Sequence, residues 1–174
     1  VFLDMKFHDI PNTVAQAIRS GALIGADMIN VHASGGPAML SAAAEAMSET
    51  GRIVIGVTVL TSMDAGELSA IGVDATPEEQ VLRLAGLVKS AGLQGVVCSA
   101  LELPVLRKTF GRDFLTVVPG IRPAGAAAGD QKRIMTPGDA ARAGADFIVV
   151  GRPILAAADP AAAARAIQDE LASA

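Results

Sequence analysis

Short apolar runs alternate with helical patterns along the whole chain, and this alternation is the strongest constraint on its fold. The runs are rich in Val and Ile and continuously hydrophobic, as is typical of parallel strands covered on both faces. The expected strands are Phe2–Lys6, Met28–His32, Ile53–Leu60, Gly95–Ser99, Phe114–Val118 and Asp146–Val150. The expected helices are Asn12–Ile24, Pro37–Glu49, Pro77–Ala91, Leu103–Phe110, Thr136–Ala143 and Pro160–Leu171.

The ends of several expected helices carry boundary signals. Thr76, Thr136 and Asp159 each precede a proline, which is the pattern of an N-cap followed by the first helical residue. Glycines stand where four helices should stop before the next strand. These glycines are Gly25, Gly51, Gly92 and Gly144. The repeating unit is therefore strand, loop, helix and glycine.

Repeated units of this kind fold either as an open doubly wound sheet or as a closed (β/α)₈ barrel. The open nucleotide-binding sheet usually carries a Gly-x-Gly-x-x-Gly turn after a strand, and this sequence has none. Six units in 174 residues would extend to about 232 residues for eight units, close to the ~250 typical of the barrel. We therefore predict an α/β chain with one (β/α)₈ barrel domain over residues 1–174, lacking about two βα units ahead of Val1.

Composition limits the classes of partner. The net charge is −4 and aromatic residues make up 3%, all of them Phe, so a basic or base-stacking nucleic-acid surface is not expected. No apolar run approaches the roughly 18 residues that span a membrane, and no secretory signal is visible. The single cysteine, Cys98, cannot form an internal disulfide, and we expect a reducing, cytoplasmic location.

Charged residues follow the first expected strand. Asp4 and Lys6 are two residues apart, so in an extended strand they project to the same side. Such a pair is either a structural ion pair in the barrel or a catalytic acid and base. Asp9 then falls in the following loop, and Asn12 or Thr13 is a plausible helix cap.

Hydroxyl and thiol groups follow the third and fourth expected strands. Thr58, Thr61 and Ser62 could bind a polar ligand, or they could cap a short helix near Met63–Leu68. Cys98 fits small-residue packing better than a nucleophile, because no histidine is near it in sequence.

The last two strands are followed by arginines. Arg122 opens a glycine-rich loop that runs to about residue 133, and Arg152 directly follows the final strand. In barrels these two loops often bind a phosphate, and guanidinium groups suit its oxygens. The alternative is that both arginines form salt bridges at the rim. His8 and His32 are the only histidines, and we interpret them as packing groups rather than metal ligands.

Taken together, these motifs resemble the orotidine 5′-monophosphate decarboxylase family, most closely its bacterial branch. The matching segments cover essentially the whole chain in the family's order: Phe2–Thr13, Asn30–Gly36, Val57–Ser62, Gly95–Ser99, Pro119–Pro123, Asp130–Arg133 and Gly151–Ile154. The Asp-x-Lys-x-x-Asp core is shared with related sugar-phosphate enzymes. The following Ile-Pro-Asn-Thr and the loop with Gln131 narrow the match to the nucleotide enzyme.

The resemblance implies a homodimer that converts orotidine 5′-monophosphate to uridine 5′-monophosphate in de novo pyrimidine synthesis, without metal or organic cofactor. Lys6 matches the lysine that faces and protonates the carbanion. Asp4 matches the carboxylate that orients this lysine beside the substrate's own carboxylate. Asp9, with Ile10 and Thr13, matches residues that reach into the neighbouring subunit's site.

The remaining matches concern the substrate. Thr61 corresponds to a base-contacting hydroxyl, and the phosphate grip is matched by Arg122, Gln131, Gly151 and Arg152. The family's ribose-binding Asp and second network Lys belong to strands that would precede Val1. Two alternatives therefore stay open: a magnesium-dependent sugar-phosphate decarboxylase or aldolase of the same superfamily, and an inactive, truncated nucleotide-phosphate binder.

Overall fold

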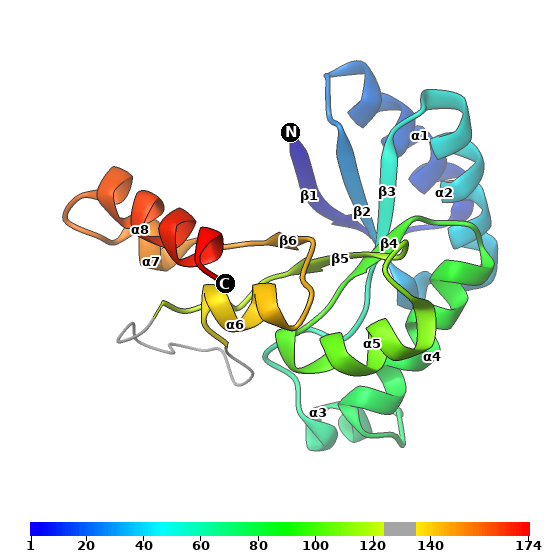
Figure 1. Cartoon of the computed structure of the whole chain (residues 1–174). Coiled ribbons are helices and arrows are strands. Elements are labelled where there is room, and N and C mark those ends of the chain that lie inside the picture. The colour runs from blue at the N-terminus through cyan, green and yellow to red at the C-terminus, as the bar shows by residue number, and fades with distance from the viewer. Residues whose placement is uncertain (124–134) are drawn as a thin grey trace.

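The computed structural model describes residues 1–123 and 135–174. Within them, six strands form one sheet in which every neighbouring pair is parallel and the spatial order equals the chain order. The strands are β1 (Phe2–Phe7), β2 (Met28–His32), β3 (Ile53–Val57), β4 (Gly95–Val97), β5 (Leu115–Val118) and β6 (Phe147–Ile148). In Figure 1, β1–β3 stand steeply whereas β4–β6 lie across the view, so the sheet is strongly curled.

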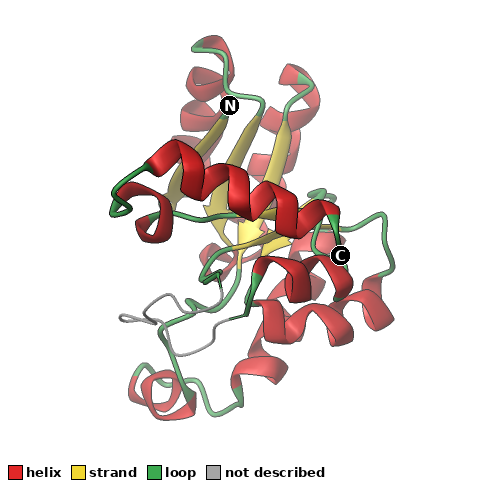
Figure 2. Cartoon of the chain, turned by 60° about the vertical axis from the view of Figure 1, so that its left-hand side comes forward, coloured by secondary structure: helices red, strands yellow, loops and turns green. Residues whose placement is uncertain are grey.

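Helices connect successive strands and lie around the outside of this curled sheet (Figure 2). The α-helices are α1 (Pro11–Leu23), α2 (Gly36–Thr50), α3 (Ala65–Ala70), α4 (Pro77–Ser90), α5 (Leu103–Phe110), α6 (Pro137–Arg142), α7 (Arg152–Leu155) and α8 (Pro160–Ala172). Two short 3₁₀ helices, η1 (Ala33–Gly35) and η2 (Ala100–Glu102), precede α2 and α5.

Strand order confirms the predicted fold class. A doubly wound sheet reverses its strand order at a switch point, whereas here each strand pairs with the next one along the chain. Sequential parallel strands with outer helices are the arrangement of the (β/α)₈ barrel. The described residues thus form a curled, six-stranded part of such a barrel. The extent of the domain and the two further βα units stay predictions.

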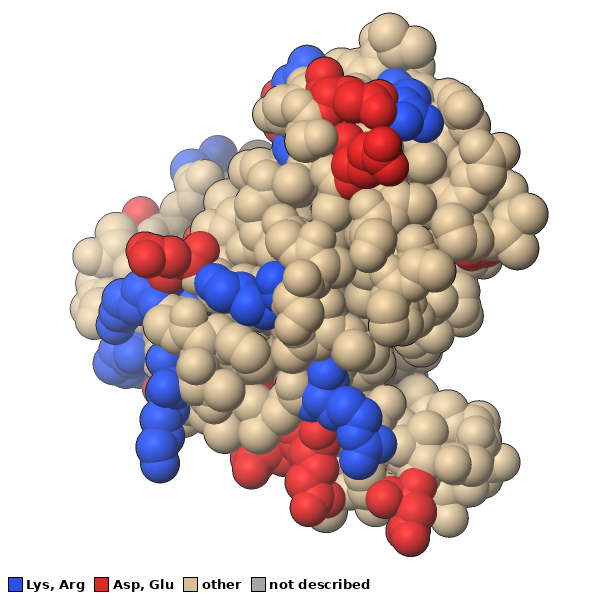
Figure 3. Space-filling view, turned by 90° about the vertical axis from the view of Figure 1, so that its right-hand side faces the viewer, with Lys and Arg blue, Asp and Glu red and all other residues tan. Residues whose placement is uncertain are grey.

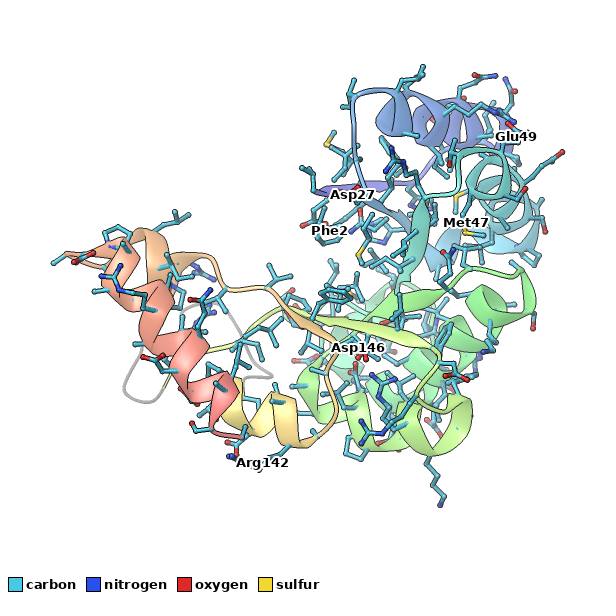
Figure 4. All side chains as sticks on the ribbon, turned by 45° about the horizontal axis from the view of Figure 1, so that its top comes forward. Phe2, Asp27, Met47, Glu49, Arg142 and Asp146 are labelled. Atoms are coloured by element: carbon cyan, nitrogen blue, oxygen red, sulfur yellow. The ribbon has the colours of Figure 1, made fainter. Side chains whose placement is uncertain are left out.

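The central strands β2–β5 are largely buried on both faces, as their continuous hydrophobicity predicts, whereas neither β1 nor β6 contains a buried residue. On the outer face, Ile29, Val54 and Val96 belong to the large core shared with the helices. Met47 of α2 packs against this core, while Glu49 lies on the outer surface (Figure 4). The inner face of the sheet carries a separate apolar cluster. Its buried members are Met28, Ile55, Val57, Val97 and Val117.

Most of the predicted helix boundaries are confirmed. Thr76, Thr136 and Asp159 are N-caps whose side chains accept backbone N–H groups, and a proline follows each. The four helix-ending glycines all have positive φ, which an L side chain adopts only at a cost.

The cap expected at the start of the first helix is wrong. Helix α1 begins at Pro11 after Ile10, and no side chain caps it. Asn12 and Thr13 are exposed residues within its first turn, because the helix already begins at Pro11, before either residue could cap it.

The last strand and the third strand are shorter than expected. β3 ends at Val57 because its partner strand ends at Val97, opposite it. β6 is reduced to two residues, and the unexpected short helix α7 begins at Arg152. Apolar composition alone does not show where a neighbouring strand stops, which is why the sequence overestimates these lengths.

A polar cluster closes the amino ends of β5 and β6. Arg107 of α5 donates to the carbonyl oxygens of Gly144 (2.9 Å) and Phe114 (2.7 Å) and to Thr116 Oγ1 (2.7 Å). Its guanidinium also pairs with Asp146 at 2.6 Å, and Figure 4 shows Asp146 lying among these elements. This cluster lies at the end of the sheet opposite the carboxyl ends of the strands.

Charged side chains of both signs occur in small groups on the face drawn in Figure 3, separated by wide uncharged areas. This mixture agrees with the net charge of −4 and shows no extended basic field on that face. Within the described residues, no helix is both long enough and apolar enough to cross a membrane.

Candidate active site

The pairing of β1 with β2 is interrupted where the charged residues lie. Phe2 and Leu3 pair with Met28 and Ile29, but the next paired residue is Phe7, opposite Val31. Four steps along β1 thus match two along β2, and the extra residues leave the ladder as a bulge. At the end of this bulge Lys6 has φ +52°, the only positive φ of a non-glycine residue in the described chain.

The bulge brings Asp4 and Lys6 together, as the sequence predicts. Lys6 Nζ donates to Asp4 Oδ1 at 2.7 Å, and the two side chains keep 39% and 43% of their surface exposed. A third residue, Asn30 of β2, joins them. Its Nδ2 donates to Asp4 Oδ1 at 2.5 Å, and its Oδ1 accepts the backbone N–H of Lys6 at 2.7 Å.

The sequence reasoning did not single out Asn30. It is fully buried, although it lies in the middle of an apolar strand. A polar residue inside a continuous apolar run was the available signal, because buried amides are retained where they find partners.

A cavity of about 250 Å³ opens next to Lys6 at the carboxyl ends of the strands. Its lining comes from β1, β3 and β4 and from the residues that follow β3, β4 and β5. The lining residues are Lys6, Val57, Val59, Leu60, Thr61, Ser62, Val97, Cys98 and Pro119. In (β/α) barrels this end of the sheet carries the active site.

The hydroxyl groups that follow β3 have different roles. Thr61 is 9% exposed and lines the cavity together with Ser62. Thr58 instead donates to the carbonyl oxygen of Val97 at 2.7 Å. Asp64 caps α3 in a capping box with Glu67, so the alternative in which these hydroxyls cap that helix is wrong.

Cys98 and Ser99 have surroundings that fit packing. Cys98 is 1% exposed and belongs to the main core, although it also touches the cavity. Ser99 caps η2, where its side chain accepts the N–H of Leu101 and Glu102 completes a capping box.

Arg122, Gly151 and Arg152, which were predicted to bind phosphate, are not among the residues that line this cavity. Arg122 is 7% exposed, and its Nη1 donates to the carbonyl oxygen of Ile121 at 2.9 Å. Gly151 is the residue before α7, and Arg152 begins that helix with an exposed side chain. Gln131 lies outside the described residues.

Asp9, Ile10 and Thr13 are exposed and do not line the cavity beside Lys6. Asp9 and Ile10 border a separate, wide hollow of about 470 Å³ together with His8, Pro11, Ser34 and Gly35. Asp9 Oδ1 accepts the N–H of Ile10 at 2.6 Å, which turns its carboxylate into this loop. Within one chain, Asp9 is therefore not brought into the cavity of Lys6.

The two histidines contact each other, and His8 borders the same hollow. Their ring centroids lie 5.5 Å apart. Burial, and then the charges of His8 and Lys6, hold the pKa of His32 below its ordinary value of 6.5. No group of three or more potential metal-ligating His, Cys, Asp or Glu side chains occurs among residues 1–123 and 135–174.

Comparisons with known proteins agree with the motifs. The family model described as orotidine 5′-phosphate decarboxylase / HUMPS family matches residues 1–167. A protein of Vibrio campbellii named orotidine 5′-phosphate decarboxylase is 56% identical over 99% of this chain and 76% of its own length. One of the same name from Chromobacterium violaceum is 57% identical over 98% of this chain and 70% of its length.

A solved structure is similar over the same extent. The crystal structure of orotidine 5′-phosphate decarboxylase from Lactobacillus acidophilus superposes with a TM-score of 0.84 at 40% identity, covering 98% of this chain and 74% of that one. The chain thus spans about three quarters of the length of the proteins it resembles.

Proposed function

The chain belongs to the orotidine 5′-phosphate decarboxylase / HUMPS family, and we propose that it decarboxylates orotidine 5′-monophosphate to uridine 5′-monophosphate. The observation that carries this proposal is the Asp4–Lys6 pair beside a cavity at the carboxyl ends of the strands. Relatives that are more than half identical over nearly the whole chain bear the name of this decarboxylase.

The reaction demands electrostatic stabilisation. When the carboxylate leaves as carbon dioxide, the electron pair of the broken bond stays on a pyrimidine carbon as a carbanion. The ammonium of Lys6 lies at the cavity and can both stabilise this charge and donate its proton to the carbon. Lys6 is then neutral and regains a proton from solvent. In this scheme no metal or organic cofactor takes part.

Asp4 holds the Lys6 ammonium in place through the 2.7 Å contact. Its negative charge would also lie next to the carboxylate of the substrate, and the repulsion is relieved as carbon dioxide leaves. The two residues therefore act as a unit, and neither is expected to work without the other.

The other site residues bind the substrate in this proposal. Thr61 lines the cavity and is assigned to the pyrimidine base. The phosphate is assigned to Arg122, Gly151 and Arg152, together with Gln131. Guanidinium groups form strong hydrogen bonds to phosphate oxygens. In (β/α) barrels the loops after the last two strands often bind a phosphate. The phosphate is bound far from the reacting carbon, and the free energy of this binding helps to order the charged residues around that carbon.

We assign the working unit to a homodimer with shared sites. Asp9, Ile10 and Thr13 are exposed and do not line the cavity of their own chain, which fits a contribution to a neighbouring subunit's site. The proposal also includes two further βα units that complete the barrel and supply the ribose-binding Asp and second Lys. The proposal includes a cytoplasmic location, because a sequence with Cys98 as its single cysteine cannot form a disulfide within the chain.

The direct test is turnover of orotidine 5′-monophosphate by the purified protein, followed as loss of the pyrimidine carboxylate. We expect turnover that is unchanged by a strong chelator of divalent cations. Turnover that requires magnesium, or that occurs only with a sugar phosphate, would favour the related magnesium-dependent enzymes. Binding of uridine 5′-monophosphate without turnover would favour an inactive nucleotide-phosphate binder.

Shared sites are tested by mixing two inactive variants, Lys6→Ala and Asp9→Ala. A mixed dimer has one site that lacks both residues and one site that is intact. Random exchange of subunits should therefore restore about a quarter of the parental activity. If each site is built from one chain, the mixture stays as inactive as its components.

A further inference from the structure

At the bulge, residues of β1 have no paired residue in β2. A side chain of β2 forms a hydrogen bond to the β1 backbone there instead. Between the pairs Leu3–Ile29 and Phe7–Val31, Asn30 is the only residue of β2 opposite the displaced segment. Its Oδ1 accepts the N–H of Lys6 at 2.7 Å. A buried N–H with no partner is costly, so this bond helps to hold Lys6 in its left-handed conformation.

The same amide group also holds the carboxylate. Asn30 Nδ2 donates to Asp4 Oδ1, the oxygen atom that accepts from Lys6 Nζ. Hydrogen bonds to a charged acceptor are stronger than those between neutral groups. This one fixes the position of Asp4 Oδ1, the atom that also accepts from the Lys6 ammonium. The orientation of the amide is determined, since the reverse would place its carbonyl oxygen against the carboxylate.

Asn30 itself is held rigidly. It is fully buried, and it pairs with Ile55 within the regular β2–β3 ladder. Its neighbours in sequence, Ile29 and Val31, are both fully buried in the main core. The amide is therefore a fixed point from which the two partly exposed residues, Asp4 and Lys6, are positioned.

We propose that Asn30 is a positioning residue for the reaction. Its side-chain amide donates one hydrogen bond to Asp4 and accepts one from the backbone N–H of Lys6, and the two bonds together hold both residues in their reactive arrangement. This inference rests on the proposed decarboxylase function. An amide is required because one side chain must donate to Asp4 and accept from Lys6 at once. A carboxylate of the same shape can only accept, and an aliphatic side chain can do neither.

The test compares Asn30→Ala and the isosteric Asn30→Asp with the parent. Turnover is expressed per site that binds uridine 5′-monophosphate, so that loss of folded protein does not count as loss of catalysis. We expect kcat to fall about 100-fold in Asn30→Ala, because a misplaced reacting group costs about that factor. KM and affinity for uridine 5′-monophosphate should change by less than about threefold. Asn30→Asp should lose at least as much, since its carboxylate repels Asp4.

A matched control is Thr116→Ala. Thr116 is also fully buried in a strand and also hydrogen-bonded on two sides, but its partners are Arg107 and Asp146 at the opposite end of the sheet. Its loss should lower stability and leave kcat per binding site unchanged.

The inference is overturned if kcat per binding site of folded Asn30→Ala stays within about threefold of the parent. An equal loss in Thr116→Ala would also overturn it, and so would failure of both Asn30 variants to fold, since Asn30 would then be a structural residue. An inactive parent would instead contradict the proposed function, so that the two failures are distinguishable.

Discussion

Lys6 Nζ lies 2.7 Å from Asp4 Oδ1, and neither side chain is buried. Within the described residues the pair is therefore partly exposed rather than buried. Partly exposed pairs of this kind contribute little to stability. Their position at the cavity and the strained backbone beneath them fit catalysis better than structure.

Lys6→Ala should abolish decarboxylation while affinity for uridine 5′-monophosphate stays measurable. The reason is that the ammonium stabilises the carbanion and donates the proton, whereas other residues bind the nucleotide. We expect kcat to fall by at least about 1,000-fold, since both electrostatic stabilisation and the proton donor are lost. Single-turnover assays and titration with the product check this. Lys108→Ala, which removes an exposed lysine from α5, is the control. Near-parental turnover in Lys6→Ala would remove Lys6 from the reaction.

Arg152→Ala should weaken binding of the substrate more than it slows the reaction. Loss of a charge-assisted hydrogen bond costs about 1.5–3 kcal/mol, which corresponds to a rise in KM of roughly 10- to 100-fold. Steady-state kinetics with orotidine 5′-monophosphate measure this rise. Arg165→Ala, which changes an exposed arginine of α8, should leave KM unaltered. Unchanged kinetics in Arg152→Ala would exclude Arg152 from the phosphate site.

Arg107→Ala should destabilise the fold without changing kcat per binding site. Its side chain is 12% exposed and joins β5, β6 and α5 through Asp146 and Thr116. Because Asp146 keeps 30% of its side-chain surface exposed, the loss should lie below the roughly 3 kcal/mol of a fully buried pair, and urea denaturation can measure it. Arg142→Ala breaks an exposed pair with Asp139 and should cost much less. Equal stability losses in the two variants would contradict a special role for the Arg107 cluster.

Stability should decrease as the pH falls from about 7 to about 5, with His32 as one cause. The pKa of His32 is lower in the folded chain than the ordinary 6.5, chiefly through burial. Below pH 6.5 the unfolded chain therefore takes up a proton that the folded chain does not, and unfolding becomes easier. The measurement is the free energy of unfolding across this range.

His32→Gln should flatten this pH dependence, whereas His8→Gln should reduce it only in part, because burial is the largest cause of the lowered pKa. A parental slope in His32→Gln would show that other groups produce the effect.

The sequence predicted the architecture because its signals are local. The apolar runs, the Thr76 and Asp159 caps and the helix-ending glycines each act within a few residues, and the structure confirms them. The proximity of Asp4 and Lys6 was also predicted, but from regular strand alternation, whereas in the structure a bulge brings the two side chains together.

Features that depend on a neighbouring strand could not be predicted in this way. The bulge exists only in the pairing of β1 with β2, and the role of Asn30 follows from that pairing. The end of β3 is likewise decided by the length of β4. The separation of Asp9 from the cavity depends on how the loop after β1 turns, which residue spacing does not reveal.

The positive φ of Lys6 lowers the stability of the folded chain, and this loss can be measured. Glycine would suit this backbone better than any side chain, so relief of the strain in Lys6→Gly is expected to outweigh the conformational freedom that glycine adds to the unfolded chain. Selection for folding alone would therefore not favour lysine here. A lysine at this position is therefore explained by its function rather than by its contribution to stability.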